Sequence, residues 1–161
     1  MLTVIGVDPG VTTGIAVFEY DKDLGERPTT AMYQADVVGA PWLLEQLVKE
    51  HTLNGTVRYH AVVIAVESYV AGRHGKGAEG TVTREFVALC DLLASRYGAK
   101  LFRRPAAAVK PWATDARLHR LGLLSATEGM RHARDAARHA LFCAVHDFGV
   151  PDPLSRKATH A

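Results

Sequence analysis

Cysteine and long apolar runs are both scarce in this sequence, and each shortage excludes a class of protein. Only two of the 161 residues are cysteines. Cys90 and Cys143 lie within apolar, helix-like segments, so we expect two buried thiols rather than a disulfide or a metal site. The apolar runs are only a few residues long, far short of the roughly 20 residues that span a bilayer. We therefore expect a cytoplasmic protein with no membrane association.

Length and composition favour one globular domain. A chain of 17.5 kDa with 48% apolar residues is large enough to bury one ordinary core. No internal repeat and no change of composition suggests a boundary, so we expect a single domain over residues 1–150 and a frayed tail over residues 151–161. The opening sequence MLTVIGVDPG lacks the basic stretch and apolar core of a signal peptide, and we expect no export signal.

The charge is nearly balanced overall but unevenly distributed. The net charge is +2, yet residues 1–80 carry 6 basic and 10 acidic side chains, whereas residues 81–161 carry 13 basic and 7 acidic ones. A basic second half permits a surface that binds a polyanion such as nucleic acid. The excess of arginine over lysine is also typical of a GC-rich genome, so charge alone leaves both explanations open.

The hydrophobic pattern predicts a mixed α/β order. Apolar, β-branched runs bounded by turn residues predict five strands: Leu2–Asp8, Val11–Tyr20, Thr29–Val38, His60–Glu67 and Ala99–Arg104. Helical periodicity predicts helices over Pro41–Leu53, Thr81–Gly98, Ala113–Leu121 and Gly129–Phe148. The short turn at Pro9-Gly10 favours three antiparallel strands first, and the fully apolar HAVVIAVE run favours a parallel strand next. We expect a mixed sheet with helices on its faces.

Two acidic residues stand where buried strands end. Asp8 closes LTVIGVD and Glu67 closes HAVVIAVE. A buried, unpaired carboxylate costs several kcal/mol, so each needs solvent or a cation. If the two strands run in the same direction, both side chains emerge at one edge of the sheet. The alternative is that Asp8 is simply a turn residue before Pro9.

The last helix carries a second polar group. His132, Asp135 and His139 lie within roughly 60° of one another around the helix axis. Taken alone, they are also what the solvent face of an amphipathic helix looks like. Combined with the strand acids, carboxylates and an imidazole suit Mg²⁺ or Mn²⁺ better than structural zinc. Two such ions can promote hydrolysis of a phosphodiester bond.

Three segments in a fixed order resemble a known family. VIGVDPGVTTGIAVFE, VVIAVE and MRHARDAARHAL are similar to segments of the RuvC-type Holliday junction resolvases, members of the ribonuclease-H-like and retroviral integrase superfamily. The resemblance spans roughly Val4–Gly149, and KPWATDARLHRLGL resembles small resolvases of bacteriophages and their hosts. It implies a ribonuclease-H-like fold with a mixed five-stranded sheet, three strands antiparallel and then parallel ones, flanked by helices.

The resemblance also implies an activity. It is that of a crossover junction endodeoxyribonuclease of DNA recombination and repair, using Mg²⁺ or Mn²⁺, with two ions per site. Asp8, Glu67 and Asp135 match the metal-binding acids, and His132 matches a position that is Asp in some members and His in others. The role of His132 as metal ligand, proton carrier or phosphate contact stays open. An alternative alignment shifts Asp135 by one turn and puts Arg138 in the last acidic position.

The resemblance further implies branched DNA as partner and a homodimer that makes two symmetric cuts. Expected DNA contacts fall in two groups, the first a glycine-rich loop after Glu67 and the second a basic stretch beyond it: Tyr69, Arg73, His74 and Lys76, then Arg103, Arg104, Lys110, Arg117 and Arg120. The helix over Phe86–Leu93 is a candidate dimer contact, although ordinary core packing explains it as well. If the chain is phage-encoded, the compartment is the bacterial host cell.

Three other functions remain open from sequence. One is a nuclease of the same fold that acts on flaps or RNA–DNA hybrids, because a metal site does not encode substrate shape. Another is a non-catalytic DNA-binding module. A sugar-kinase-like ATP site also uses an Asp-Pro-Gly hairpin, but such proteins normally need two lobes, and this chain provides one.

Overall fold

The computed structural model describes residues 1–21, 28–53, 61–68 and 77–155. The strands are β1 (Leu2–Asp8), β2 (Thr12–Tyr20), β3 (Thr29–Asp36), β4 (Ala61–Glu67) and β5 (Lys100–Arg104). The helices are α1 (Gly39–Leu53), α2 (Ala78–Tyr97), α3 (Ala106–Val109), α4 (Asp115–Arg120), α5 (Leu123–Ala126) and α6 (Arg131–Phe148). In these residues no helix is long and apolar enough to cross a bilayer.

The strands form one five-stranded mixed sheet in the order β3-β2-β1-β4-β5. β1 pairs antiparallel with β2, and β2 with β3, whereas β4 runs parallel to both β1 and β5. A short turn can join only antiparallel neighbours, while each parallel step needs a helical crossover, here α1 and α2. The predicted fold class, three antiparallel strands followed by parallel ones, is confirmed.

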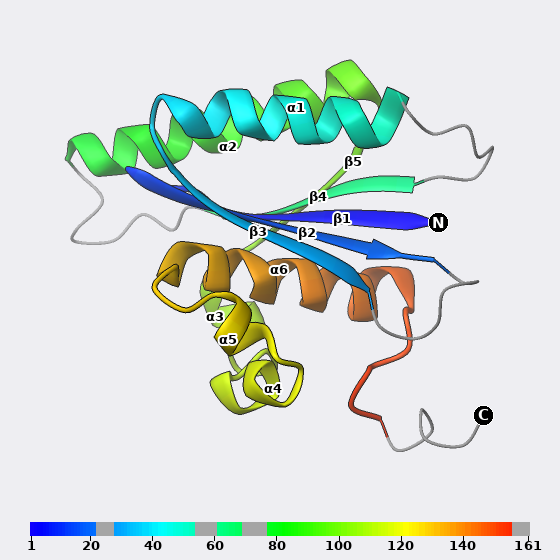
Figure 1. The fold of residues 1–161 in the computed structure, drawn as a ribbon. Helices are drawn as coiled ribbons and strands as arrows, with labels where there is room; N and C mark the ends of the chain where they lie inside the picture. Colours follow the sequence, from blue (N-terminus) through cyan, green and yellow to red (C-terminus); the bar gives the residue numbers. More distant parts are fainter. Residues whose placement is uncertain (22–27, 54–60, 69–76, 156–161) are drawn as a thin grey trace.

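The alternation of side chains divides the core into two layers. Odd-numbered residues of β1 such as Ile5 and Val7 face α1 and α2, which cover one side of the sheet. Even-numbered residues such as Val4 face α6 and the short helices α3 to α5 on the other side (Figure 1). Both strands that end in the predicted site acids are buried on both faces, as HAVVIAVE indicated.

Two glycines let α6 approach the sheet more closely than side chains would permit. A Cβ at Gly14 would lie 2.0 Å from the carbonyl oxygen of His132, and one at Gly6 would lie 2.1 Å from that of Ala136. Alanines of α6 such as Ala140 complete this close packing. The helix backbone is thereby fixed directly beside the carboxyl end of β1, where Asp8 stands.

The connection between β5 and α6 differs from the sequence prediction. One helix was expected over Ala113–Leu121, but the segment forms α3, α4 and α5. Thr114 is the N-cap of α4 and accepts a hydrogen bond from the Arg117 N–H at 3.2 Å, and Gly122, which follows α4, adopts a left-handed conformation with φ 76°. This helix start and this helix stop divide the chain into helices too short to show a periodicity of their own.

Several other elements differ at their ends, among them β3, which ends at Asp36 and not at Val38, and α1, which begins at Gly39 and not at Pro41. The helix expected over Thr81–Gly98 begins three residues earlier, at Ala78, and ends at Gly98 as predicted. In the described part of the tail, residues 151–155, Asp152 accepts hydrogen bonds from Arg117 at 2.8 and 2.9 Å, and fraying of the tail stays a prediction. Both cysteines are buried and free, as expected.

Candidate active site

A row of residues, one from each strand, crosses the whole sheet at the end where β1 and β4 stop. The strand register pairs Gln34 with Gly14, Gly14 with Asp8, and Glu67 with Arg104. Because Val7 pairs with Val66, the next residues, Asp8 and Glu67, are neighbours on adjacent parallel strands. Parallel neighbours lie about 4.8 Å apart. All members of the row lie on the α6 side of the sheet, so the two predicted acids emerge together.

Asp8 is held by the first turn of α6. Its Oδ2 lies 2.8 Å from Nδ1 of His132. The backbone N–H of His132 donates a hydrogen bond to Oε1 of Gln34 at 3.1 Å. The missing side chain at Gly14 leaves room for this arrangement. Sequence reasoning missed Gln34, whose position is visible only once the register of β3 is known.

The surroundings of Asp8 disfavour its charged form. Burial raises the pKa of Asp8 to about 6, and the negative charges of Glu67 and Asp135 add to this effect. The hydrogen bond from His132 acts in the opposite direction but does not cancel it. The carboxylates of Glu67 and Asp135 therefore disfavour a negative charge on Asp8, and a cation bound there would relieve this repulsion.

Glu67 is held by the same helix, two turns further on. Its Oε2 lies 3.2 Å from Nε2 of His139, a residue that is 2% exposed. Glu67 also borders an open hollow of about 470 Å³, lined in addition by Pro9, Ser68, Thr83, Pro105, Ala106 and Ala107. A space of this size next to the acids is within the range of ligand-binding clefts.

Both carboxylate oxygens of Asp135, the third predicted acid, accept hydrogen bonds from cationic side chains. Lys110 donates to Oδ2 at 3.0 Å, and Arg138 donates to Oδ1. Burial acts to raise the pKa of Asp135, but these two cations outweigh it and lower the pKa below its usual value. The buried Arg138 also contacts Asp115 and donates to the Ala113 carbonyl at 2.9 Å.

The side chains at this edge are suitable ligands for a divalent cation, but their present arrangement is not a complete metal site. Asp8 and Glu67 present neighbouring carboxylate oxygens, the ligands that Mg²⁺ and Mn²⁺ prefer. Within the described ranges, however, no three His, Cys, Asp or Glu side chains are gathered closely enough to hold a metal ion. The strand acids thus fit a cation as a pair, and Asp135 would first have to exchange its bonds to Lys110 and Arg138.

The described members of the predicted DNA contacts are spread over both sides of the sheet. Tyr69, Arg73, His74 and Lys76 lie outside the described residues. Arg103 pairs with Asp91 on the α2 side of the sheet. Arg104 donates to both oxygens of Asp147 on the α6 side, and Arg117 pairs with Asp152 and covers the ring of Trp112 at 4.0 Å. Lys110 is bonded to Asp135, and Arg120 is exposed. DNA binding by each residue stays a prediction.

Most apolar side chains of the predicted dimer helix are buried in the core. Phe86, Cys90 and Leu93 are buried against the sheet, whereas Leu92 is 61% exposed. Core packing therefore explains most of the apolar stripe over Phe86–Leu93, and a dimer through this helix stays a prediction.

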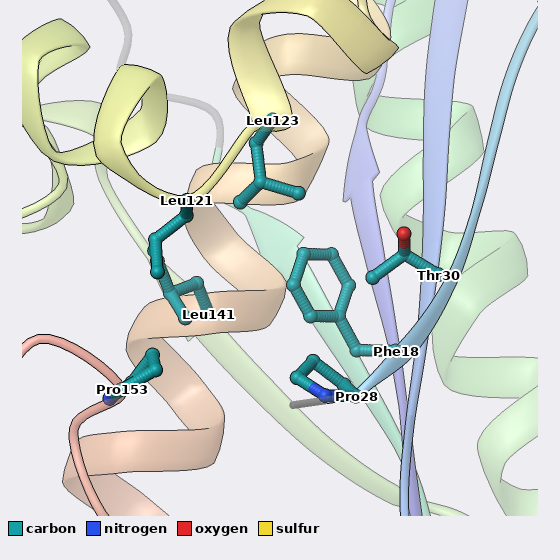
Figure 2. A pocket seen from close by; sticks show the side chains of 7 residues that line it. All are labelled: Phe18, Pro28, Thr30, Leu121, Leu123, Leu141 and Pro153. Atoms are coloured by element: carbon teal, nitrogen blue, oxygen red, sulfur yellow. The ribbon is translucent and has the colours of Figure 1, made fainter. Parts of the chain in front are cut away.

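A second hollow lies on the α6 side, and its lining carries no acid or base. It encloses about 80 Å³ between β2, the turn before α5 and the C-terminal segment (Figure 2), and is lined by Phe18, Pro28, Thr30, Leu121, Leu123, Leu141 and Pro153. This volume is well below that of ordinary ligand sites. The site acids and the larger hollow beside Glu67 remain the better candidate for chemistry.

Solved structures share this architecture. RuvC of T. thermophilus in complex with a Holliday junction substrate matches with a TM-score of 0.59 and 21% identity, over 93% of this chain and 98% of its own. The chain has a RuvC-like resolvase fold. A second Thermus thermophilus RuvC structure gives a TM-score of 0.57 and 16% identity over 92% and 97% of the two chains.

A viral protein has a similar fold. Fowlpox virus resolvase in complex with Holliday junction DNA matches with a TM-score of 0.51 and 13% identity, over 86% of this chain and 94% of its own. No protein-family model matches the chain, and neither does any curated protein. At these identities the likeness establishes the fold, and the resemblance in the sequence is confirmed at that level.

Proposed function

We propose that this protein is a divalent-metal-dependent endonuclease that resolves four-way DNA junctions by symmetric hydrolytic nicking. The observation that carries the proposal is the placement of Asp8 and Glu67 as neighbours at one sheet edge, with His132 and Asp135 brought to it by α6. The RuvC-like fold supports it, since two similar proteins were solved with Holliday junction DNA.

In this proposal Asp8 and Glu67 hold Mg²⁺ or Mn²⁺, and His132 and Asp135 complete the site. The chemistry that such cations would supply when bound is an activated water and a stabilised leaving oxygen. His132 has a side chain that is 29% exposed and stays within reach of solvent, so it is placed to exchange a proton at this edge. The hollow beside Glu67 provides space for the nucleotide that adjoins the cleaved phosphate.

Lys110 connects metal binding to DNA binding in this scheme. Its ammonium group now neutralises Asp135. If Asp135 turns to a cation, Lys110 is released at the same edge and can contact a phosphate. A homodimer presenting two such edges would match the two-fold symmetry of a four-way junction and place the protein in DNA recombination and repair.

Cleavage assays with three substrates test the proposal. Wild-type protein should nick a mobile four-way junction at symmetric positions with Mg²⁺ or Mn²⁺, faster than it cleaves a flap or an RNA–DNA hybrid. Asp8→Asn should abolish cleavage yet still bind the junction, because it removes a metal ligand and no phosphate contact. Preference for a hybrid would overturn the substrate, and an active D8N variant would overturn the metal role.

A non-catalytic junction-binding module is the second candidate, and Asp135 favours it. Both oxygens of this carboxylate are bonded to Lys110 and Arg138, so the third acid is already neutralised without a metal. A module of this kind would bind junctions with the same affinity in the presence and absence of Mg²⁺, and neither wild-type nor D8N protein would cleave them.

A further inference from the structure

His139 is a buried imidazole that the proposed chemistry does not use. It lies in α6 and is 2% exposed, in a crevice lined mainly by apolar side chains such as Ala65 and Phe102, together with Arg104, which is paired with Asp147. Its Nε2 lies 3.2 Å from Oε2 of Glu67. An unpaired polar group in such surroundings is costly, so this hydrogen bond is what makes a histidine tolerable here.

The direction of this hydrogen bond follows from the chemistry of the pair. An ionised carboxylate can only accept, so Nε2 carries a hydrogen and donates the hydrogen bond to Glu67. The donated bond fixes one oxygen of Glu67 and leaves the rest of the group at the border of the 470 Å³ hollow. A free glutamate side chain at the end of a strand would instead sample several rotamers.

The two strand acids are therefore held in the same way by one helix. His132 contacts Asp8 and His139 contacts Glu67, and seven residues, about two helical turns, separate the two histidines. They differ in access, because the side chain of His132 is 29% exposed and that of His139 only 2%. His139 is shielded from any substrate, so it can act only through Glu67.

We propose that His139 is a positioning residue: its Nε2–H orients the carboxylate of Glu67 for cation binding at the sheet edge. This rests on the proposed function in one respect, the role of Glu67 as a metal ligand. Partners that orient a ligating carboxylate typically contribute 10- to 100-fold to metal affinity.

Binding of Mn²⁺ to the protein without DNA tests the proposal independently of cleavage. Titration calorimetry or the EPR signal of free Mn²⁺ gives the affinity for wild-type protein and three variants. Glu67→Gln should lose Mn²⁺ binding, and His139→Leu, which keeps the volume but removes the donor, should weaken it 10- to 100-fold. His139→Gln, which restores an N–H donor, should stay within about threefold of wild type.

His146→Leu is the matched control, because His146 lies two turns further along α6 and stacks on Phe142, away from Glu67. It should leave Mn²⁺ affinity unchanged, and thermal unfolding of each variant checks that it is folded. If H139L binds Mn²⁺ as wild type does while E67Q does not, the proposal is wrong. If H139Q is as defective as H139L, shape rather than the donor matters, and the proposal is again wrong.

The outcomes also separate this inference from the proposed function. Wild-type protein that binds Mn²⁺ through Glu67 but cleaves no junction would overturn the nuclease assignment and leave the comparison of H139L with H139Q decisive. Wild-type protein whose Mn²⁺ binding is not reduced by E67Q would overturn the role of His139, whatever its activity on DNA.

Discussion

Asp8 stands at a position where its own charge opposes folding. Burial and the neighbouring carboxylates of Glu67 and Asp135 raise its pKa from 3.8 to about 6. A carboxylate whose pKa is raised by folding binds its proton more tightly in the native state, so its ionisation destabilises that state. A residue kept in spite of this cost is typical of functional sites, where stability and activity conflict.

Asp8→Asn should therefore stabilise the metal-free protein at neutral pH. The penalty is absent below pH about 4, where Asp8 is protonated in both states, develops between pH about 4 and 6, and is complete above that range. A shift of about two pKa units corresponds to roughly 2 to 3 kcal/mol. Urea unfolding of wild-type and D8N protein across this pH range, without divalent cations, measures the difference.

Asp36 provides the control for this prediction. Its carboxylate accepts hydrogen bonds from the backbone N–H groups of Gly39 and Val38, which lower its pKa, so its ionised form favours folding. Asp36→Asn should not stabilise the protein at neutral pH. A D8N variant whose unfolding free energy equals that of wild type at pH 7 would show that Asp8 carries no such penalty.

The site acids and the histidines of the last helix could be found from sequence, but which histidine meets which acid could not. Asp8 and Glu67 each follow a strongly apolar run, a local signal that reports the end of a buried strand. Gln34 reaches the backbone N–H of His132 through the register of β3, and His139 meets Glu67 through the path of α6 across the sheet. Such contacts depend on long-range packing, which no local pattern contains.

At the scale of elements, the site depends on how closely α6 lies on the sheet. The helix passes over β2 and β1 at Gly14 and Gly6, where only a missing side chain allows contact with its backbone. The hydrophobic pattern predicted α6 correctly, but it could not show that two strand glycines set its height above the sheet.

Gly14→Ala should move the start of α6 away from Asp8. The added Cβ would lie 2.0 Å from the His132 carbonyl, which is backbone and cannot rotate away. We expect a loss of about 1 to 3 kcal/mol in the free energy of unfolding and weaker Mn²⁺ binding, because the contact between His132 and Asp8 is disturbed. Urea unfolding and Mn²⁺ titration measure the two effects.

Gly39→Ala is the matched control, since its Cβ would meet Asp36 Oδ1 at an ordinary contact distance of 3.5 Å. It begins α1, on the opposite layer, and should change the free energy of unfolding by less than about 0.5 kcal/mol. A G14A variant with the stability and Mn²⁺ affinity of wild type would mean that α6 can shift without consequence.

The segment over α3 to α5 shows where prediction of elements fails. Sequence patterns identify long amphipathic helices, but α3 and α5 have four residues each, about one turn. Tertiary contacts hold the start of α4 between them, where the buried Arg138 contacts Asp115 and donates to the Ala113 carbonyl. An arginine in an amphipathic helix gives no sign that it will be buried.

At the scale of the whole molecule, charge counted along the chain is a poor guide to charge on the surface. The basic second half suggested a DNA-binding patch, but several of its cations are neutralised within the fold, including Arg103 by Asp91 and Arg104 by Asp147. The strand period places these two consecutive residues on opposite faces of the sheet. Sequence alone predicted the layers and the edge at which the acids meet, but not which cations stay available.

Arg131 is the described cation best placed for DNA at this edge. It is exposed and begins α6 next to His132. Arg131→Ala should weaken binding to a four-way junction several-fold and reduce the slope of log affinity against log salt by about one, as expected for a lost phosphate contact. Arg103→Ala, on the α2 side, should change neither quantity. Fluorescence anisotropy at several salt concentrations measures both, and a larger effect of R103A than of R131A would place the DNA on the other face of the molecule.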